Sequence, residues 1–138
     1  MIDEFDRAIL AHLLTDGSAS QAELGVSAHL SGPAAGRRKR LLEEQQILLG
    51  CQGKVAFDKL GFGTLVMILI QLESQKRETL SAFERAIDRC PSVLSCYLLS
   101  GVEDYLVTLR ARDLSDYESI HRSELSELPG VTRMQSLF

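Results

Sequence analysis

The sequence lacks most of the residues from which metal sites and disulfide frameworks are built. It contains no tryptophan, and only three cysteines and three histidines. The cysteines, Cys51, Cys90 and Cys96, form no Cys-x-x-Cys pair, and the histidines show no metal-ligand spacing. We expect no metal and no cofactor, and interpret the cysteines as small core residues in a reducing compartment. No Ser/His/Asp, Cys/His or paired-carboxylate spacing indicates a catalytic residue.

Long hydrophobic runs are also missing. The most apolar stretch, Leu65 to Leu72, is interrupted by Gln71 and has the length of a strand. The N-terminus is acidic, without the basic start and apolar stretch of a secretory signal. These absences predict a cytoplasmic protein with no membrane partner. A chain of 138 residues with 45% hydrophobic residues is typical of one globular domain or two small ones.

The formal net charge of −4 does not indicate a nucleic-acid-binding protein, but the distribution of charge is uneven. Bases outnumber acids between residues 31 and 63, and acids outnumber bases on both sides. Four consecutive bases, Arg37 to Arg40, lie in this central region. Such a run is often only a solvated helix face, so its meaning depends on its structural context.

The first 45 residues carry signals for three short helices. Residues 3–15 have apolar residues at helical spacing, and Asp16-Gly17 ends that pattern. Ser20 and Glu23 form a capping box that begins a second helix. A third helix is expected from about Pro33 to Gln45. Three short helices, the last of them basic, predict a helix-turn-helix unit.

Two strand-like segments follow, at residues 47–51 and 54–57, and the turn between them predicts a wing hairpin. The glycine-rich residues 58–63 are expected to connect two domains, residues 1–58 and 59–138. In the second domain, strands are expected at 64–73, 93–99, 104–112 and 131–138, and helices at 75–90 and 114–128. The order β-α-β-β-α-β predicts a ferredoxin-like domain, and the whole chain an α+β protein.

Several fragments, in this order and spacing, resemble the Lrp/AsnC family of bacterial and archaeal regulators, the "feast/famine" proteins. The likeness covers nearly all of the chain. The most specific fragment is Gly101-x-x-Asp104-Tyr105-Leu106, which is similar to the signature turn of the family's regulatory domain. The other fragments are Asp6-Arg7-x-Ile9-Leu10, Asp16-Gly17-x-x-Ser20, Glu23-Leu24, Leu30-Ser31, Arg37-Arg38, Leu42-Glu43, Ile47-x-x-Gly50, Leu60-Gly61-Phe62 and Leu128-Pro129-Gly130-Val131.

The resemblance implies a winged helix-turn-helix joined to an ACT-like regulatory domain. It implies a transcriptional regulator that binds double-stranded DNA, forms homodimers or octamers, and responds to a small-molecule effector, usually an amino acid. The effector is expected between regulatory domains near the signature turn. The expected effector-binding residues are Ser100, Gly101, Asp104, Tyr105, Met134 and Ser136. Family members often carry hydroxyls at both of the last two positions, so Met134 favours an apolar effector, or none.

A helical wheel of the third helix places its alanines and leucines on one side. Gly36, Lys39 and Arg40 fall on the opposite side, Arg37 lies at its edge, and Arg38 lies nearer the apolar side. Cations on the exposed side can meet phosphate or guanine, and a glycine there permits close backbone approach. The expected DNA-binding residues are Ser31, Gly36, Arg37, Arg38, Lys39 and Arg40.

Two other functions remain open at this stage. Gly25 and Gly36 inside helices, with Lys39 and Leu41 departing from the family pattern, favour a ligand-sensing or co-assembly module with weakened DNA binding. An enzyme similar to haem-pathway decarboxylases of the same fold is the third reading, although His121 is the only histidine in the second half.

The first strand of the second domain also predicts a dimer. It is apolar on both faces, while two helices can cover only one face of a four-stranded sheet. Packing of two sheets face to face in a two-fold dimer would cover the other face. The expected interface residues are Val66, Ile68, Ile70 and Leu72.

Overall fold

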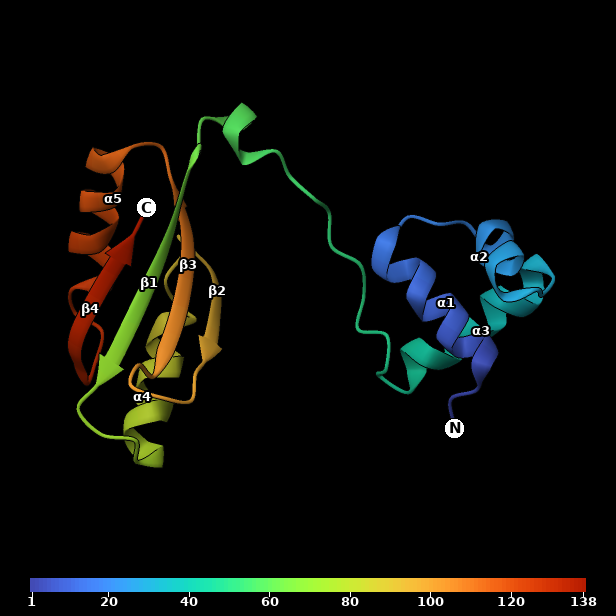
Figure 1. Cartoon of the computed structure of the whole chain (residues 1–138), viewed down its shortest axis with the longest axis horizontal. Coiled ribbons are helices and arrows are strands. Elements are labelled where there is room, and N and C mark those ends of the chain that lie inside the picture. Colours follow the sequence, from blue (N-terminus) through green and yellow to red (C-terminus); the bar gives the residue numbers. More distant parts are fainter. The chain divides into compact units, whose positions relative to one another are not determined.

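The computed structural model describes all 138 residues, and the chain forms two compact units, residues 1–54 and 55–138 (Figure 1). Each unit has its own hydrophobic core. The boundary lies between Lys54 and Val55 rather than after Asp58. The reason is that Phe57 packs beneath Arg110 of the second unit.

The first unit consists of three helices, α1 (Glu4–Thr15), α2 (Gln21–Ala28) and α3 (Gly32–Glu44). Asp3, Ser20 and Ser31 cap them, each accepting a hydrogen bond from the backbone N–H three residues later. The helices enclose a small core of Ile9, Leu13, Ala19, Leu24, Ala28, Ala35 and Leu42. The predicted three-helix arrangement is therefore confirmed.

The predicted wing hairpin is wrong for the isolated chain. Residues 49–56 form neither helix nor strand, and Phe57–Leu60 forms a 3-10 helix, η1. A two-stranded hairpin without a third strand or a covering helix is marginally stable in water. Residues 51–56 are all exposed, so nothing in the chain covers such a hairpin.

The second unit is a four-stranded antiparallel sheet with spatial order β2-β3-β1-β4. Its elements are β1 (Thr64–Leu72), α4 (Arg77–Ile87), β2 (Val93–Leu98), β3 (Tyr105–Ala111), α5 (Leu114–Ile120), η2 (His121–Leu125) and β4 (Val131–Leu137). The predicted β-α-β-β-α-β order and α+β class are confirmed. One expected helix is divided, because the chain changes from α-helix to a π-helical turn at His121.

The alternate side chains of β1 face opposite sides of the sheet. Val66, Ile68, Ile70 and Leu72 are buried, in one cluster with Phe83 of α4 and other residues of the two helices. The four residues expected at a dimer interface therefore fill the core of their own unit, and that expectation is wrong. Side chains of a strand alternate between the two faces of the sheet. An error of one residue in assigning the faces therefore moves every side chain to the wrong face.

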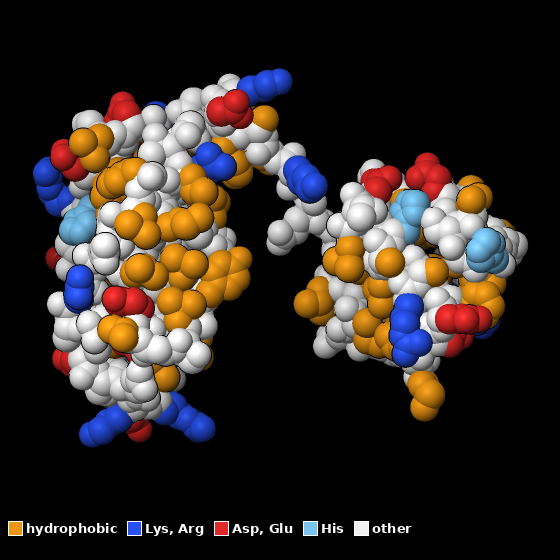
Figure 2. Space-filling view, in the orientation of Figure 1, with side chains coloured by type: hydrophobic (Ala, Val, Ile, Leu, Met, Phe, Trp, Pro, Cys, Tyr) orange, Lys and Arg blue, Asp and Glu red, His pale blue; other side chains and the backbone are white.

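The other face of the sheet has no helix over it, and Figure 2 shows hydrophobic side chains gathered on it. Leu65 and Met67 of β1 are exposed there, beside Tyr97 of β2 and Leu137 of β4. Cross-strand pairing places Tyr97 opposite Leu106 and Leu137 opposite Met67, so these side chains share one face. This face is called the outer sheet face below.

None of the helices in the structure is long and apolar enough to span a lipid bilayer.

Candidate nucleic-acid interface and ligand region

The turn between α2 and α3 is tightly built. His29 adopts a left-handed backbone conformation with φ 57°, and the N–H of Leu30 donates to the carbonyl oxygen of Gly25 at 2.9 Å. A Cβ on Gly25 would lie 2.6 Å from the carbonyl oxygen of Leu30. A glycine is therefore required at position 25, because the carbonyl oxygen of Leu30 lies too close for a Cβ. Gly25 thus gives no indication that the helix-turn-helix has lost its function.

Gly36 has a different environment from the one expected. It is buried rather than exposed, and a Cβ there would lie 2.4 Å from the side-chain amide of Gln21 on α2. The expectation that Gly36 offers its backbone to DNA is wrong for this conformation. The glycine makes room for Gln21, which the sequence pattern does not reveal.

The four consecutive bases of α3 do not share one role. Arg37 and Arg40 are exposed, and neither forms an ion pair in the structure. Lys39 lies 3.9 Å from Glu43, one turn along the helix, in a pair that water screens. Ser31 caps the helix by accepting from the N–H of Ala34, and its hydroxyl proton remains available to an external acceptor.

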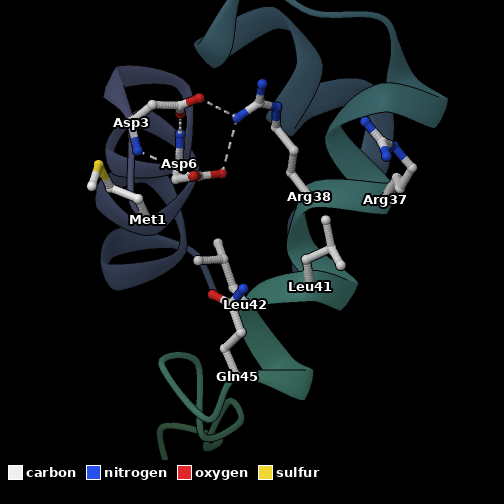
Figure 3. Close-up of a pocket in the computed structure, with 8 residues that line it drawn as sticks. All are labelled: Met1, Asp3, Asp6, Arg37, Arg38, Leu41, Leu42 and Gln45. Atoms are coloured by element: carbon white, nitrogen blue, oxygen red, sulfur yellow. Dashed lines mark hydrogen bonds and ion pairs between the residues drawn. The ribbon is translucent and has the colours of Figure 1, made fainter.

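Arg38 is partly exposed, and its guanidinium points toward α1 (Figure 3). Its Nη1 donates to a carboxylate oxygen of Asp3 at 2.7 Å and to one of Asp6 at 3.3 Å. Its guanidinium carbon lies 5.0 Å from the centroid of the Phe5 ring, within cation–π range. Sequence reasoning placed Arg38 near the apolar edge but missed these partners, because acids in a first turn are explained by the helix dipole alone.

The contact of Arg38 with Asp3 and Asp6 joins α3 to the N-terminus of α1. Asp3 and Asp6 also cap α1 reciprocally, each accepting from the backbone N–H of the other. The N–H of Asp6, followed by Arg38, lowers the pKa of Asp3 below its usual 3.8. The same ion pair, with Asp3 as its largest cause, raises the pKa of Arg38. The ion pair therefore links the N-terminus of α1 to α3.

A shallow hollow of about 190 Å³ lies beside this ion pair, between α1 and α3. It is lined by Met1, Asp3, Asp6, Arg37, Arg38, Leu41, Leu42 and Gln45 (Figure 3). Its carboxylates are already engaged by Arg38. Leu41, which also lines the hollow, is exposed.

The signature turn of the second unit is held by its aspartate. Asp104 is buried, and its carboxylate accepts from the N–H of Leu72 at 2.7 Å and from Nε2 of Gln75 at 2.8 Å. Its own N–H donates to the carbonyl oxygen of Ile70. Asp104 thus joins the end of β1 to the start of β3, and its side chain is not open to a ligand.

Tyr105 is also internal. Its hydroxyl donates to a carboxylate oxygen of Glu84 at 2.7 Å, and its ring lies 4.6 Å from that of Phe83. Burial, followed by the bond to Glu84, raises the pKa of the Tyr105 hydroxyl. The aromatic side chain therefore anchors the turn to α4 instead of contacting a ligand.

The turn itself is open. Ser100, Gly101 and Val102 are exposed, and Gly101 has φ 135°, a conformation that other residues rarely adopt. The N–H groups of Gly101 and Val102 donate no hydrogen bond within the chain. The groups that remain available to an effector are therefore the Ser100 hydroxyl and the backbone N–H groups of Gly101 and Val102.

Met134 and Ser136 lie on β4, opposite Ile70 and Ile68 of β1. Both are half-buried and share the helix-covered face with these core residues. Met134 packs against the core, and Ser136 shares a hydrogen bond with the hydroxyl of Tyr117 on α5. The structure therefore does not bring either side chain to the open part of the signature turn.

One group of potential metal ligands is present, formed by His12, Asp16 and Glu23, with ligand atoms within 4.8 Å of one another. Nδ1 of His12 is hydrogen-bonded to Ser27 at 2.5 Å, and Asp16 accepts from the N–H and hydroxyl of Ser18. These bonds account for the orientation of His12 and Asp16 without an ion.

Comparison with known protein families assigns both units. Residues 2–43 match the AsnC-type helix-turn-helix domain, and residues 65–138 match the Lrp/AsnC ligand-binding domain. The chain belongs to the Lrp/AsnC family. Both matches fall within the units that the structure separates.

Curated relatives in the Lrp/AsnC family are regulators of transcription. The chain is 31% identical to the Bkd operon transcriptional regulator of Pseudomonas aeruginosa over 99% of this chain and 90% of the relative. It is 33% identical to the transcriptional regulator AzlB of Bacillus subtilis over 96% of this chain and 84% of that protein. The chain is accordingly a DNA-binding transcriptional regulator and not an enzyme, so the decarboxylase reading is wrong.

Solved structures of the family have the same fold. A transcriptional regulator of Neisseria meningitidis, crystallised as a complex with L-methionine, aligns with TM-score 0.88 and 25% identity over 100% of this chain and 89% of that one. An AsnC family regulator from Agrobacterium tumefaciens aligns with TM-score 0.87 and 25% identity over 99% of this chain and 89% of that one.

Proposed function

We propose that α3 binds the major groove of double-stranded DNA and that Arg37 and Arg40 supply the principal cationic contacts. The observation that carries this proposal is that these two arginines are exposed and unpaired. Lys39 contributes a third cation once its screened pair with Glu43 opens. Ser31 and Arg38 position the helix, Ser31 by capping it and Arg38 by its contacts with α1.

Binding to duplex DNA across a salt series tests this proposal. Each phosphate contact contributes about 0.9 to the slope of log K against log salt concentration. Arg37→Ala/Arg40→Ala should lower both the affinity and the slope. Arg7→Ala/Lys54→Ala removes the same charge from exposed positions of the first unit and serves as the matched control. Equal losses in both double variants would show that only net charge matters.

The alternative is a co-assembly module with weak DNA binding. The engagement of Arg38 by Asp3 and Asp6 favours it, because one of the four bases is withdrawn from DNA. The structural roles of Gly25 and Gly36 remove another reason for it. Absence of salt-dependent binding by the unmodified protein at low salt would establish this alternative.

We infer that an amino acid is the effector and that its carboxylate accepts from the free N–H groups of the signature turn. The support is the open backbone of Gly101 and Val102, together with the L-methionine complex of the Neisseria relative. A single turn offers little enclosed surface, so a second copy must complete the site. The inwardly bonded side chains of Asp104 and Tyr105 shape this turn.

Calorimetric titration of the full chain with L-methionine, L-leucine and D-methionine tests the effector proposal. Gly101→Ala should weaken binding of the L-amino acid, because φ 135° strains any side chain. Gly63→Ala is the control, since Gly63 has open space around it and an ordinary φ. Binding that is equal in both variants would place the effector elsewhere.

We further propose that two copies associate through the outer sheet face, and that the regulator acts in the cytoplasm as a dimer or a larger assembly. The support is the uncovered apolar surface of Leu65, Met67 and Tyr97. Met67→Glu should lower the sedimentation coefficient to that of a monomer. Leu114→Glu adds the same charge at an exposed position of α5 and should leave the assembly unchanged.

A further inference from the structure

The short helix η1 is joined to the sheet by two arginine–aromatic contacts. The guanidinium carbon of Arg110 lies 5.4 Å from the ring centroid of Phe57, and that of Arg112 lies 4.9 Å from the ring centroid of Phe62. Both distances are within the range of a cation–π interaction. Arg110 lies near the end of β3, and Arg112 directly follows the strand.

The two rings are the buried part of an otherwise exposed segment. Between residues 55 and 63, only Phe57 and Phe62 are partly buried. The N–H of Phe62 donates to the carbonyl oxygen of Phe57 at 2.9 Å, which closes the turn. Gly61, with φ 88°, permits this closure by ending η1 in the left-handed conformation. The backbone connection of this segment to β1 therefore does not by itself explain why the rings of Phe57 and Phe62 are partly buried.

The preceding segment is attached to the first unit. Leu48 packs against the core of the helical unit, and its N–H donates to the carbonyl oxygen of Leu42 at 3.1 Å. The side chain of Cys51 lies next to Gly17, where an added Cβ would meet Cβ of Cys51 at 3.0 Å. Residues 52–54 are exposed, belong to no helix or strand and have no such attachment. The carbonyl oxygens of Val55 and Ala56 already accept from the N–H groups of Phe57 and Lys59 in η1.

The geometry points to a clamp, formed by Arg110 and Arg112 on Phe57 and Phe62, that confines the interdomain hinge to residues 52–54. An extended hinge of this length reaches about 10 Å, whereas a chain free as far as Gly63 would reach about 40 Å. The clamp therefore limits how far the DNA-binding unit can move from the regulatory unit. Its effect on DNA spacing depends on the proposed function, but the clamp itself does not.

Trypsin provides a test because a lysine lies on each side of the clamp boundary. Lys54 lies in the hinge, and Lys59 lies within η1. Mass spectrometry of briefly digested full-length protein should show rapid cleavage after Lys54 and slow cleavage after Lys59. In Arg110→Gln/Arg112→Gln and in Phe57→Leu/Phe62→Leu, cleavage after Lys59 should rise about tenfold, given the strength of two such pairs. Cleavage after Lys54 should stay unchanged.

Two control variants accompany this test. Phe57→Tyr/Phe62→Tyr keeps both rings and should preserve the protection of Lys59. Arg133→Gln removes an exposed arginine of β4 that stacks on no ring in the structure and should also preserve it. Sedimentation of every variant reports whether its assembly has changed. No DNA or effector is present, so failure of the clamp is distinguishable from failure of the proposed function.

Three results would overturn the clamp. The first is equal cleavage after both lysines in the unmodified protein. The second is unchanged protection of Lys59 in both the arginine and the phenylalanine variants. The third is exposure of Lys59 only in a variant that has also lost its assembly, because protection would then come from the second copy.

Discussion

Arg38 of α3 and Asp3 at the N-terminus of α1 are joined by a hydrogen-bonded ion pair of 2.7 Å. The same guanidinium contacts Asp6 and lies over the ring of Phe5. One basic residue of α3 is therefore used to orient the helix on which the other three bases lie. We therefore expect substitutions within this run of bases to affect DNA affinity and the stability of the helical unit separately.

Replacement of Arg38 by glutamine should lower the melting temperature of the protein by a few degrees, because the packing over Phe5 and the ion pairs are lost. Arg40→Gln removes a solvent-exposed cation that forms no ion pair. This substitution should leave the melting temperature unchanged. DNA affinity should respond in the opposite order, with Arg40→Gln reducing the salt slope. Thermal unfolding and DNA titration of both variants check this, and equal melting temperatures would contradict it.

The pH dependence of stability should carry the signature of Asp3. Its pKa is lowered in the folded state, first by the N–H of Asp6 and then by Arg38. The stabilisation is therefore complete above the unfolded pKa of 3.8 and is lost as the pH falls through the lower folded value. Asp3→Asn should be less stable than the unmodified protein at pH 7, and the difference should disappear in acid. Urea unfolding of both proteins at pH 7 and in acid measures this difference.

The two helix glycines form a matched pair for alanine substitution. At Gly25 the new Cβ meets a backbone oxygen at 2.6 Å, which cannot move without opening the turn. At Gly36 it meets the flexible end of Gln21, which can turn away, while the helix gains about 1 kcal/mol in propensity. Gly25→Ala should therefore destabilise the protein by about 2 kcal/mol or more, and Gly36→Ala should be close to neutral. Urea unfolding measures both, and the reverse order would contradict this reading.

Much of the fold could be predicted because local signals and periodicity agree. The cap at Ser20 and the strand pattern at residues 104–112 predicted elements that the structure confirms. The failures have physical causes. The face of β1 could not be chosen, because both sets of its side chains are apolar and only the position of the helices distinguishes them. The wing was predicted from strand propensity, but no third strand or helix of the chain covers the hairpin.

The candidate site was less predictable than the fold. A helical wheel places side chains by direction but does not identify their partners, so Asp3 as partner of Arg38 and Gln21 as neighbour of Gly36 were missed. The signature turn was found, but Asp104 and Tyr105 are bonded inward to Gln75 and Glu84. These partners lie far away in the sequence, and no local pattern connects them.

Removal of the Asp104 carboxylate should destabilise the regulatory unit. The carboxylate is buried, and its loss would leave the N–H of Leu72 without an acceptor, at a cost of about 1–3 kcal/mol. Asp104→Ala should therefore lower the urea midpoint clearly. Glu103→Gln is the neighbouring control, and its midpoint should not change. A stable Asp104→Ala variant would mean that the turn is held by its backbone alone.

The three cysteines should react with a thiol reagent at very different rates. Burial, followed by the charges of Glu84 and Asp88, raises the pKa of Cys96 to about 11, and burial also raises the pKa of Cys90. The thiolate is the reactive form, so both thiols should be nearly inert at pH 8. Cys51 is exposed and should react first. A disulfide reagent should thus modify one thiol per folded chain rapidly, and Cys51→Ser should abolish that phase. Rapid modification of a second thiol would show that the core beside β2 opens more readily than its packing indicates.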